Sequence, residues 1–150
     1  MRFIALFCGL FFATIAQAGD FTVNMGNRFF MVHTPPVPNG AAVIILHGGE
    51  QKAATFAGAS DPIGIKAASD ADGFTVAFGQ AVGGNWNDSN QGPSSTVDDV
   101  TYIRNVIAAL AEFNVDPSRI FVAGVSNGGM MTERLACEFD TIAGFAVVSM

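Results

Sequence analysis

The pattern of apolar positions predicts that strands and helices alternate along most of the chain. The run AAVIIL at 41–46 is apolar throughout and is bounded by turn residues, which is typical of a strand buried on both faces. Upstream of it, two apolar-rich segments flank a Gly-Asn turn at 26–27, which predicts a β-hairpin. In sequence order, the predicted strands are 21–25, 28–33, 41–46, 74–78, 120–124 and 142–148.

Helical periodicity is clearest over 97–113, where apolar residues recur every three or four positions along one face. Ser95 or Thr96 is expected to cap this helix with its side-chain oxygen. Asp98 and Asp99 are expected to be helix-start residues, because negative charge is favoured at the positive end of the helix dipole.

Two further helices and one long loop complete the pattern. One helix is predicted at 63–71 and is ended by Gly73, and another is predicted at 127–139. The segment 79–95 is rich in Gly, Asn and Ser and is expected to be a surface loop. A hairpin followed by alternating strands and helices predicts one α/β domain with a mostly parallel sheet. In such sheets, functional sites lie at the carboxyl ends of the strands.

Composition narrows the classes of protein that fit this pattern. The chain has 150 residues, of which 50% are hydrophobic and 13% charged, so it can bury a core and is not a disordered protein. Its formal net charge of −6, with no basic cluster, argues against a nucleic-acid partner. No group of Cys and His residues has metal-ligand spacing, and neither a metal nor a cofactor is expected.

Residues 1–18 have the features of a secretory signal peptide. A basic residue precedes an apolar run over 3–15, and the final AQA predicts cleavage before Gly19. An uncleaved anchor is the alternative, but the run is shorter than the roughly 20 apolar residues that a membrane span needs. We therefore expect a secreted or periplasmic protein with no stable membrane anchor. Its mature chain would retain Cys137 as its single cysteine, either buried or lacking a partner.

The segment GVSNG at 124–128 carries the candidate chemistry. It has the G-x-S-x-G form of a nucleophile elbow, in which a sharp turn between a strand and a helix exposes a serine. The predicted strand 120–124 and helix 127–139 supply that context, so Ser126 is the candidate nucleophile, with a structural Gly-rich turn as the alternative. Asn127 begins the helix, and its backbone N–H is expected to point at a developing oxyanion.

A second oxyanion donor is expected from the loop after the third predicted strand. There the sequence has His47-Gly48-Gly49, a His-Gly-Gly form whose glycines let backbone N–H groups approach a substrate. His47 is expected to shape this loop, and its alternative role is that of the base. Trp86, in the predicted loop 79–95, is either a wall of the substrate pocket or part of the packing of that loop. His47 and Trp86 are therefore candidate pocket residues.

Four short segments occur in the order seen in one group of esterases. They are HGG at 47–49, WND at 86–88, VDDV at 97–100 and GVSNGGM at 124–130. Over nearly all of 28–150 the chain resembles the exported poly(3-hydroxybutyrate) depolymerase-like enzymes, which are relatives of feruloyl and acetylxylan esterases. The resemblance implies an α/β-hydrolase fold with Ser126 as the nucleophile. It also implies an oxyanion hole formed by Asn127 and the loop 47–49.

The triad of that fold follows the order Ser, acid, His, and this sequence has no His after Ser126. His33 lies in a predicted strand and His47 in the oxyanion loop. We therefore expect the acid and the base beyond Met150, with residues 19–150 forming the N-terminal part, and the first six strands, of a single domain. Since loss of a triad His costs about 10⁶ in kcat, the residues present should not hydrolyse esters efficiently by themselves.

Taken together, these features predict hydrolysis of carboxylic esters through an acyl-enzyme on Ser126. The candidate substrates are a hydroxyalkanoate polyester, or a feruloyl or acetyl ester on a plant polysaccharide. A peptidase or lactone hydrolase on the same fold is the alternative among enzymes. A non-catalytic exported binding module is the alternative from another class. A protein that had lost its catalytic activity would not be expected to retain the strained turn of a nucleophile elbow.

Overall fold

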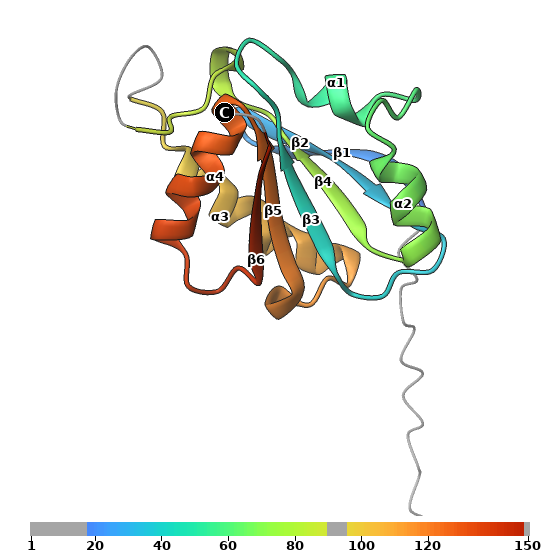
Figure 1. Cartoon of the computed structure of the whole chain (residues 1–150). Helices are drawn as coiled ribbons and strands as arrows, with labels where there is room; N and C mark the ends of the chain where they lie inside the picture. Colours follow the sequence, from blue (N-terminus) through green and yellow to red (C-terminus); the bar gives the residue numbers. More distant parts are fainter. Residues whose placement is uncertain (1–17, 90–95, 149–150) are drawn as a thin grey trace, which may run out of the picture.

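The computed structural model of the protein describes residues 18–89 and 96–148, and within them six strands form one sheet with helices on both faces (Figure 1). The strands are β1 (Gly19–Met25), β2 (Arg28–Thr34), β3 (Ala42–Leu46), β4 (Thr75–Gly79), β5 (Ile120–Val125) and β6 (Gly144–Val148). The helices are α1 (Ala53–Ala57), α2 (Ile65–Asp72), α3 (Asp99–Ala109) and α4 (Asn127–Glu138), with short 3-10 helices at Val82–Gly84, Leu110–Phe113 and Pro117–Arg119. The predicted signal peptide, residues 1–18, falls outside the described residues except for Ala18.

The strand order of the sheet is β1-β2-β4-β3-β5-β6. The hairpin strand β2 pairs antiparallel with β1 and with β4, whereas β4, β3, β5 and β6 run parallel to one another. This is the mostly parallel sheet that the alternating pattern predicted. Leu46 pairs with Gly79 on one side and with Gly124 on the other, so the carboxyl ends of three strands meet at one edge of the sheet.

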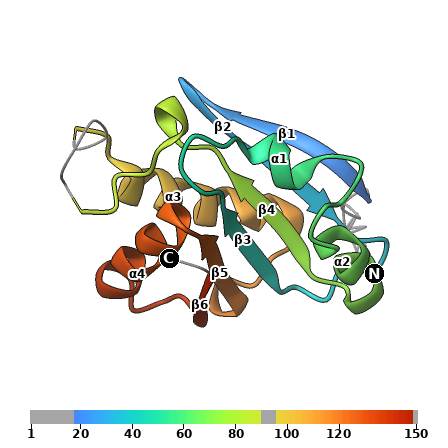
Figure 2. The same cartoon turned by 45° about the horizontal axis from the view of Figure 1, so that its top comes forward.

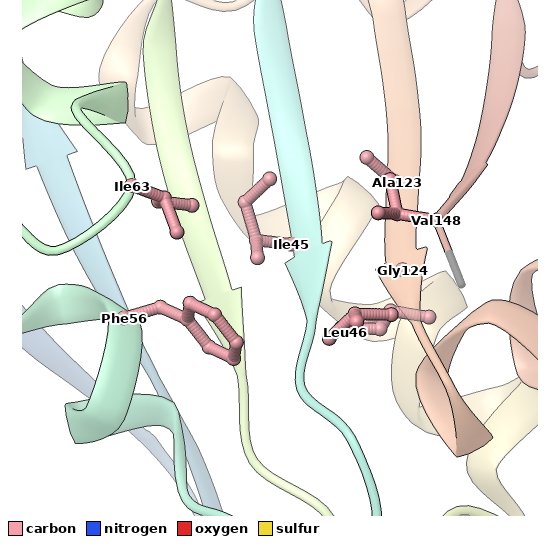
Figure 3. A pocket seen from close by; sticks show the side chains of 8 residues that line it. Ile45, Leu46, Phe56, Ile63, Ala123, Gly124 and Val148 are labelled. Carbon is pink, nitrogen blue, oxygen red and sulfur yellow. The ribbon is translucent and has the colours of Figure 1, made fainter. Parts of the chain in front are cut away.

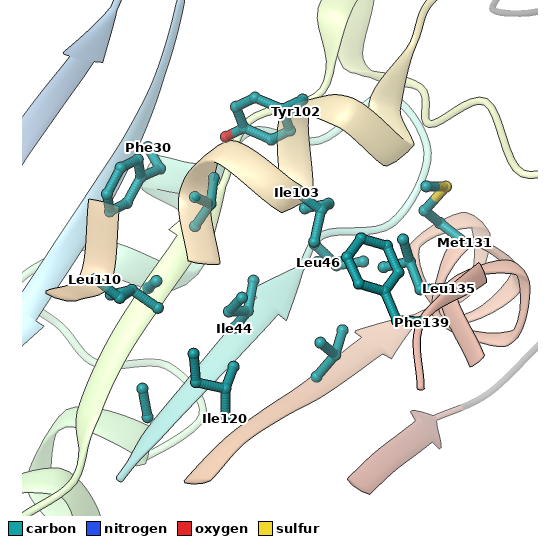
Figure 4. Close-up of a cluster of buried hydrophobic side chains, with 14 of the residues drawn as sticks. Phe30, Ile44, Leu46, Tyr102, Ile103, Leu110, Ile120, Met131, Leu135 and Phe139 are labelled. Atoms are coloured by element: carbon teal, nitrogen blue, oxygen red, sulfur yellow. The ribbon is translucent and has the colours of Figure 1, made fainter. Parts of the chain in front are cut away.

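The core occupies both faces of the sheet because neighbouring residues of a strand point to opposite sides. Ile44 and Leu46 belong to the larger cluster, under α3 and α4, together with Ile103 and Leu135 (Figure 4). Ile45 belongs to the smaller cluster on the face covered by α1 and α2. Figure 2 shows the two pairs of helices on opposite sides of the sheet. Burial on both faces explains the uninterrupted apolar run of β3.

The helix predicted over 97–113 begins two residues later than expected, and its predicted cap is wrong. Asp98 is the capping residue, and its Oδ1 accepts a hydrogen bond of 2.9 Å from the backbone N–H of Thr101. Thr96 does not cap the helix, and Ser95 lies outside the described residues. The carboxylate of Asp98 is placed to reach the third N–H of α3, which leaves no capping role for a residue further upstream.

Two other features differ from the expectations. The segment 79–95, predicted as a surface loop, is described only as far as Ser89, and within that part Trp86 and Asn87 are buried, with 2% and 3% exposure. Helix α1 was not predicted, since five residues are too few to show helical periodicity. Strand β6 lies at the edge of the described sheet, and its Phe145 and Val147 are 37% and 39% exposed.

Candidate active site

Ser126 occupies the sharp turn between β5 and α4 that the sequence predicted. Its backbone has φ 52° and ψ −122°, a conformation that residues with a side chain rarely adopt. Backbone strain of this kind costs about 1–3 kcal/mol and persists only where the surroundings impose it. The N–H of Ser126 donates to the main-chain oxygen of Val148 (3.1 Å), and its own oxygen accepts from the N–H of Met130 (3.0 Å). The side chain is exposed at the edge where the parallel strands end.

The two flanking glycines are required by close packing around this turn. A Cβ on Gly124 would overlap the main-chain oxygen of Gly128 and would lie 2.5 Å from Oγ1 of Thr132. A Cβ on Gly128 would overlap the main-chain oxygens of Leu46 and His47. Helix α4 therefore starts directly against the end of β3. The glycines of the G-x-S-x-G pattern are explained by these contacts.

The ring of His47 is fully engaged beneath the loop 47–49, which is the predicted oxyanion loop. His47 is 1% exposed, with Nδ1 2.8 Å from the main-chain oxygen of Gly48 and Nε2 3.1 Å from the N–H of Ala81. Because Nε2 must accept from Ala81, the ring proton lies on Nδ1 and is donated to Gly48. Burial lowers the pKa of His47, with a smaller opposing contribution from the bond to Gly48. Both nitrogens are thus occupied, which favours a loop-shaping role over that of a base.

The two glycines of the oxyanion loop differ in their surroundings. The N–H of Gly48 already donates to Oε1 of Gln51 (2.9 Å). Gly49 lies beside the start of α4, where a Cβ would be 3.7 Å from Cβ of Asn127 and 2.9 Å from Oδ1 of Asn85. The structure thus brings the oxyanion loop and the elbow side by side, at Gly49 and Asn127.

Trp86 lies behind the oxyanion loop, within the core. Its indole N–H donates to the main-chain oxygen of His47 (2.9 Å), and its ring packs against the rings of His47 and Tyr102 at centroid distances of 5.1 and 6.1 Å. With 2% exposure, Trp86 fits the loop-packing alternative and not that of a pocket wall. Neither His47 nor Trp86 presents the surface expected of a residue that lines a pocket.

An apolar cavity of about 300 Å³ lies beside the elbow, and it is lined by β3, β5 and the region of α1 (Figure 3). Val125, immediately before Ser126, contributes to its lining. Phe56 and Ile63 also line it, although sequence reasoning did not single them out. These two residues lie more than 60 positions before Ser126 in the chain, so no local sequence pattern indicates that they lie near the elbow.

His33 lies at the opposite end of the sheet from Ser126. It pairs with Val76 near the start of β4, whereas the elbow follows the end of β5. Its Nδ1 is 2.8 Å from Oδ1 of Asp20, and its Nε2 is 3.0 Å from Oδ1 of Asp70. His33 and His47 are the two histidines of the sequence, and both have other partners than Ser126.

The structure also bears on metal binding, on membrane-spanning helices and on the state of Cys137. In the part of the chain that the structure describes, no group of three or more His, Cys, Asp and Glu residues could hold a metal ion. None of the helices in the described ranges is long and apolar enough to cross a bilayer. Cys137 has a free thiol and is exposed, not buried.

Comparison with known proteins gives the same fold. The acetyl xylan esterase from Aspergillus awamori is similar over 87% of this chain and 51% of its own, with a TM-score of 0.69 and 21% identity. This chain has the α/β-hydrolase fold. The predicted fold class is therefore confirmed. No family model matches the chain.

At the sequence level, this chain is similar to a poly(3-hydroxyalkanoate) depolymerase and to a poly(3-hydroxybutyrate) depolymerase. It is 29% identical over 148 residues to the poly(3-hydroxyalkanoate) depolymerase C of Paucimonas lemoignei, and 30% identical over 148 residues to the poly(3-hydroxybutyrate) depolymerase of Ralstonia pickettii. These matches cover 90% and 84% of this chain, but 34% and 30% of the relatives. The chain thus spans about a third of the length of the curated relatives it matches.

Proposed function

We propose that this α/β-hydrolase acts as a serine esterase that forms an acyl-enzyme on Ser126. The observation that carries the proposal is the exposed Ser126 with φ 52° in a turn where Gly124 and Gly128 leave no room for side chains. Strain that the surrounding packing enforces is concentrated at active sites, where it preorganises a reacting group. The sequence similarity to depolymerases supports the same chemistry.

In the proposed reaction, Oγ of Ser126 attacks the carbonyl carbon of an ester. The carbonyl oxygen becomes an oxyanion, which the backbone N–H groups of Asn127 and Gly49 stabilise. Gly49 is preferred over Gly48 because the N–H of Gly48 donates to Gln51. Collapse of the tetrahedral intermediate releases the alcohol, and water then hydrolyses the acyl-enzyme and restores Ser126.

The acid and the base of this reaction are proposed to come from residues outside these 150. Proton transfer from Ser126 needs a base within hydrogen-bonding reach. The side chains of His33 and His47 are both engaged elsewhere, as described above. In this proposal, residues 19–150 are part of a single catalytic domain, and residues 1–18 are a signal peptide that directs the protein to export.

The proposed substrates are carboxylic esters, either polyhydroxyalkanoate-type polyesters or acetyl or feruloyl esters of polysaccharides. The names of the similar proteins, two polyester depolymerases and an acetyl xylan esterase, support these two classes. A peptidase or lactone hydrolase would use the same elbow on a different carbonyl. Rates on a polyester film, an acetylated xylan, a lactone and a peptide would separate these alternatives.

The test uses a fluorophosphonate probe on the protein expressed from the complete reading frame of its source gene. We expect a covalent adduct on the peptide that contains Ser126. Ser126→Ala should abolish that adduct, while the control Ser118→Ala, which removes another exposed serine hydroxyl, should retain it. A folded protein without an adduct, or a frame that supplies no further His, would favour the non-catalytic binding module.

A further inference from the structure

Residues 81–88, named here the bridging segment, connect the oxyanion loop to the elbow. Hydrogen bonds join this segment to His47 of the oxyanion loop and to Glu50, the residue that follows the loop. Ala81 donates its N–H to Nε2 of His47 (3.1 Å), and Trp86 donates its indole N–H to the main-chain oxygen of His47 (2.9 Å). The N–H of Glu50 donates to the main-chain oxygen of Gly84 (2.8 Å). The position of the oxyanion loop therefore depends on the position of this segment.

The side chain of Asn127 joins the same segment to the elbow. Its Oδ1 accepts from the N–H of Trp86 (2.8 Å), and its Nδ2 donates to the main-chain oxygen of Trp86 (3.2 Å). Nδ2 also donates to Oδ2 of Asp88 (2.7 Å), an acceptor whose negative charge strengthens the bond. All three partners belong to the bridging segment, and none belongs to helix α4, which Asn127 begins.

The bridging segment is itself held rigidly by buried polar groups. The N–H of Asn87 donates to Oδ2 of Asp99 (2.7 Å), and its main-chain oxygen accepts from Nη1 of Arg134 (2.6 Å). Asp99 is fully buried and forms an ion pair of 2.7 Å with Arg28. These bonds tie the segment to α3, α4 and β2, so it can serve as a fixed spacer.

We propose that Asn127 is a positioning residue that sets the distance between the two oxyanion donors. Its backbone N–H is one donor, while its side chain holds Trp86, which in turn holds the loop that carries the Gly49 donor. Donors of an oxyanion hole must be held within a few tenths of an ångström, because the gain comes from preorganisation. This inference rests on the proposed esterase function and adds to it a role for a side chain that the sequence motif leaves unspecified.

The test exchanges the two side chains of the Asn127–Asp88 pair. Asn127→Asp removes the donor and places two carboxylates together, which should break the contact. Adding Asp88→Asn returns a donor–acceptor pair of unchanged total charge with its direction reversed. Asn105→Ala, at an exposed position of α3, serves as the control.

Two readouts distinguish positioning from a purely structural role. The first is the fluorescence of Trp86, the single Trp of these 150 residues, with a Trp86→Phe variant to identify its contribution. The second is the rate at which a fluorophosphonate labels Ser126 in the protein from the complete reading frame. In Asn127→Asp we expect emission at longer wavelength, stronger quenching by acrylamide and labelling slower by about 100-fold, as a displacement of about 1 Å can cause.

In the combined variant, emission, quenching and labelling should all return toward those of the unmodified protein. The proposal is overturned if Asn127→Asp leaves Trp86 and the labelling rate unchanged, or if Trp86 responds without any loss of labelling. It is also overturned if the two substitutions act additively. If Asn127→Asp does not fold, the combined variant decides, since its folding and labelling recover only if the pair interacts. If the unmodified protein is not labelled, the proposed function fails. The fluorescence of Trp86 in the single and combined variants then still shows whether the side chain of Asn127 holds Trp86.

Discussion

Gly128 lies against the main-chain oxygen of Leu46 so closely that a Cβ at this position would overlap it. This contact docks the first turn of α4 onto the end of β3, and it places the elbow beside the oxyanion loop. Residue 128 comes two positions after the serine, so the same contact places Ser126 close to the end of β3. The spacing of the motif is therefore a packing requirement between two strands and a helix.

Replacement of Gly128 by Ala should destabilise the protein strongly. The new methyl group has no space, and overpacking of this kind costs about 3 kcal/mol. Gly129→Ala is the control in the same helical turn, where the Cβ would lie 3.0 Å from Cγ1 of Val147. There the gain of about 1 kcal/mol in helix propensity offsets much of the crowding. Urea unfolding midpoints of the two variants should differ clearly, and equal midpoints would contradict the packing argument.

Replacement of Ser126 by Gly should give a more stable protein than replacement by Ala. Both variants lose the side-chain hydroxyl, but only Gly adopts φ 52° with ψ −122° without strain. The relief of about 1–3 kcal/mol exceeds the conformational entropy cost of a glycine, about 0.5–1 kcal/mol, so we expect a net difference of about 1 kcal/mol. Thermal unfolding of the pair measures it. An Ala variant as stable as the Gly variant would show that the turn is not strained.

Asp99→Asn should destabilise the fold far more than Asp98→Asn, although the two residues are adjacent. Asp99 is fully buried and pairs with Arg28 at 2.7 Å, so its neutralisation leaves a largely buried guanidinium without its counter-charge, at about 3–5 kcal/mol. Asp98 caps α3, and Asn is an equally good cap. Chemical unfolding of both variants tests this difference, and similar losses would mean that the ion pair has little role.

The stability of the protein should fall at mildly acidic pH in a way that depends on His47. Burial lowers the pKa of His47 below 6.5, so the folded protein keeps this ring neutral where the unfolded chain binds a proton. The stabilisation is therefore present above pH 6.5 and is lost as pH falls below it, by up to about 1.4 kcal/mol per pH unit.

His47→Gln isolates this contribution because Gln does not titrate and His33 is present in both proteins. The free energy of unfolding should decrease less between about pH 7.5 and about pH 5.5 in the variant than in the unmodified protein. Parallel curves for the two proteins would show that His47 is not kept neutral by the fold.

Much of this fold was predictable because its signals are local. Apolar-rich runs marked β3, β4 and β5, and a glycine with φ 83° ends α2 at Gly73 as expected. The strand–turn–helix context of Ser126 followed from the same reasoning, although its catalytic role stays a prediction. Helix α1, with five residues, has no periodicity to detect. The exposure of Phe145 depends on what covers β6, which no local pattern encodes.

The sequence by itself determined the six strands, the helices longer than α1, and which serine stands at the sharp turn, because periodicity and glycine spacing act over a few residues. Only the tertiary structure decided that Trp86 is buried behind His47, and that the side chain of Asn127 bonds to residues about 40 positions away in the chain. These contacts join the ends of different strands, where side chains meet only after the sheet has formed. Hydrogen bonds between distant segments, and the burial of their side chains, depend on that three-dimensional arrangement. Local patterns in the sequence do not specify such an arrangement.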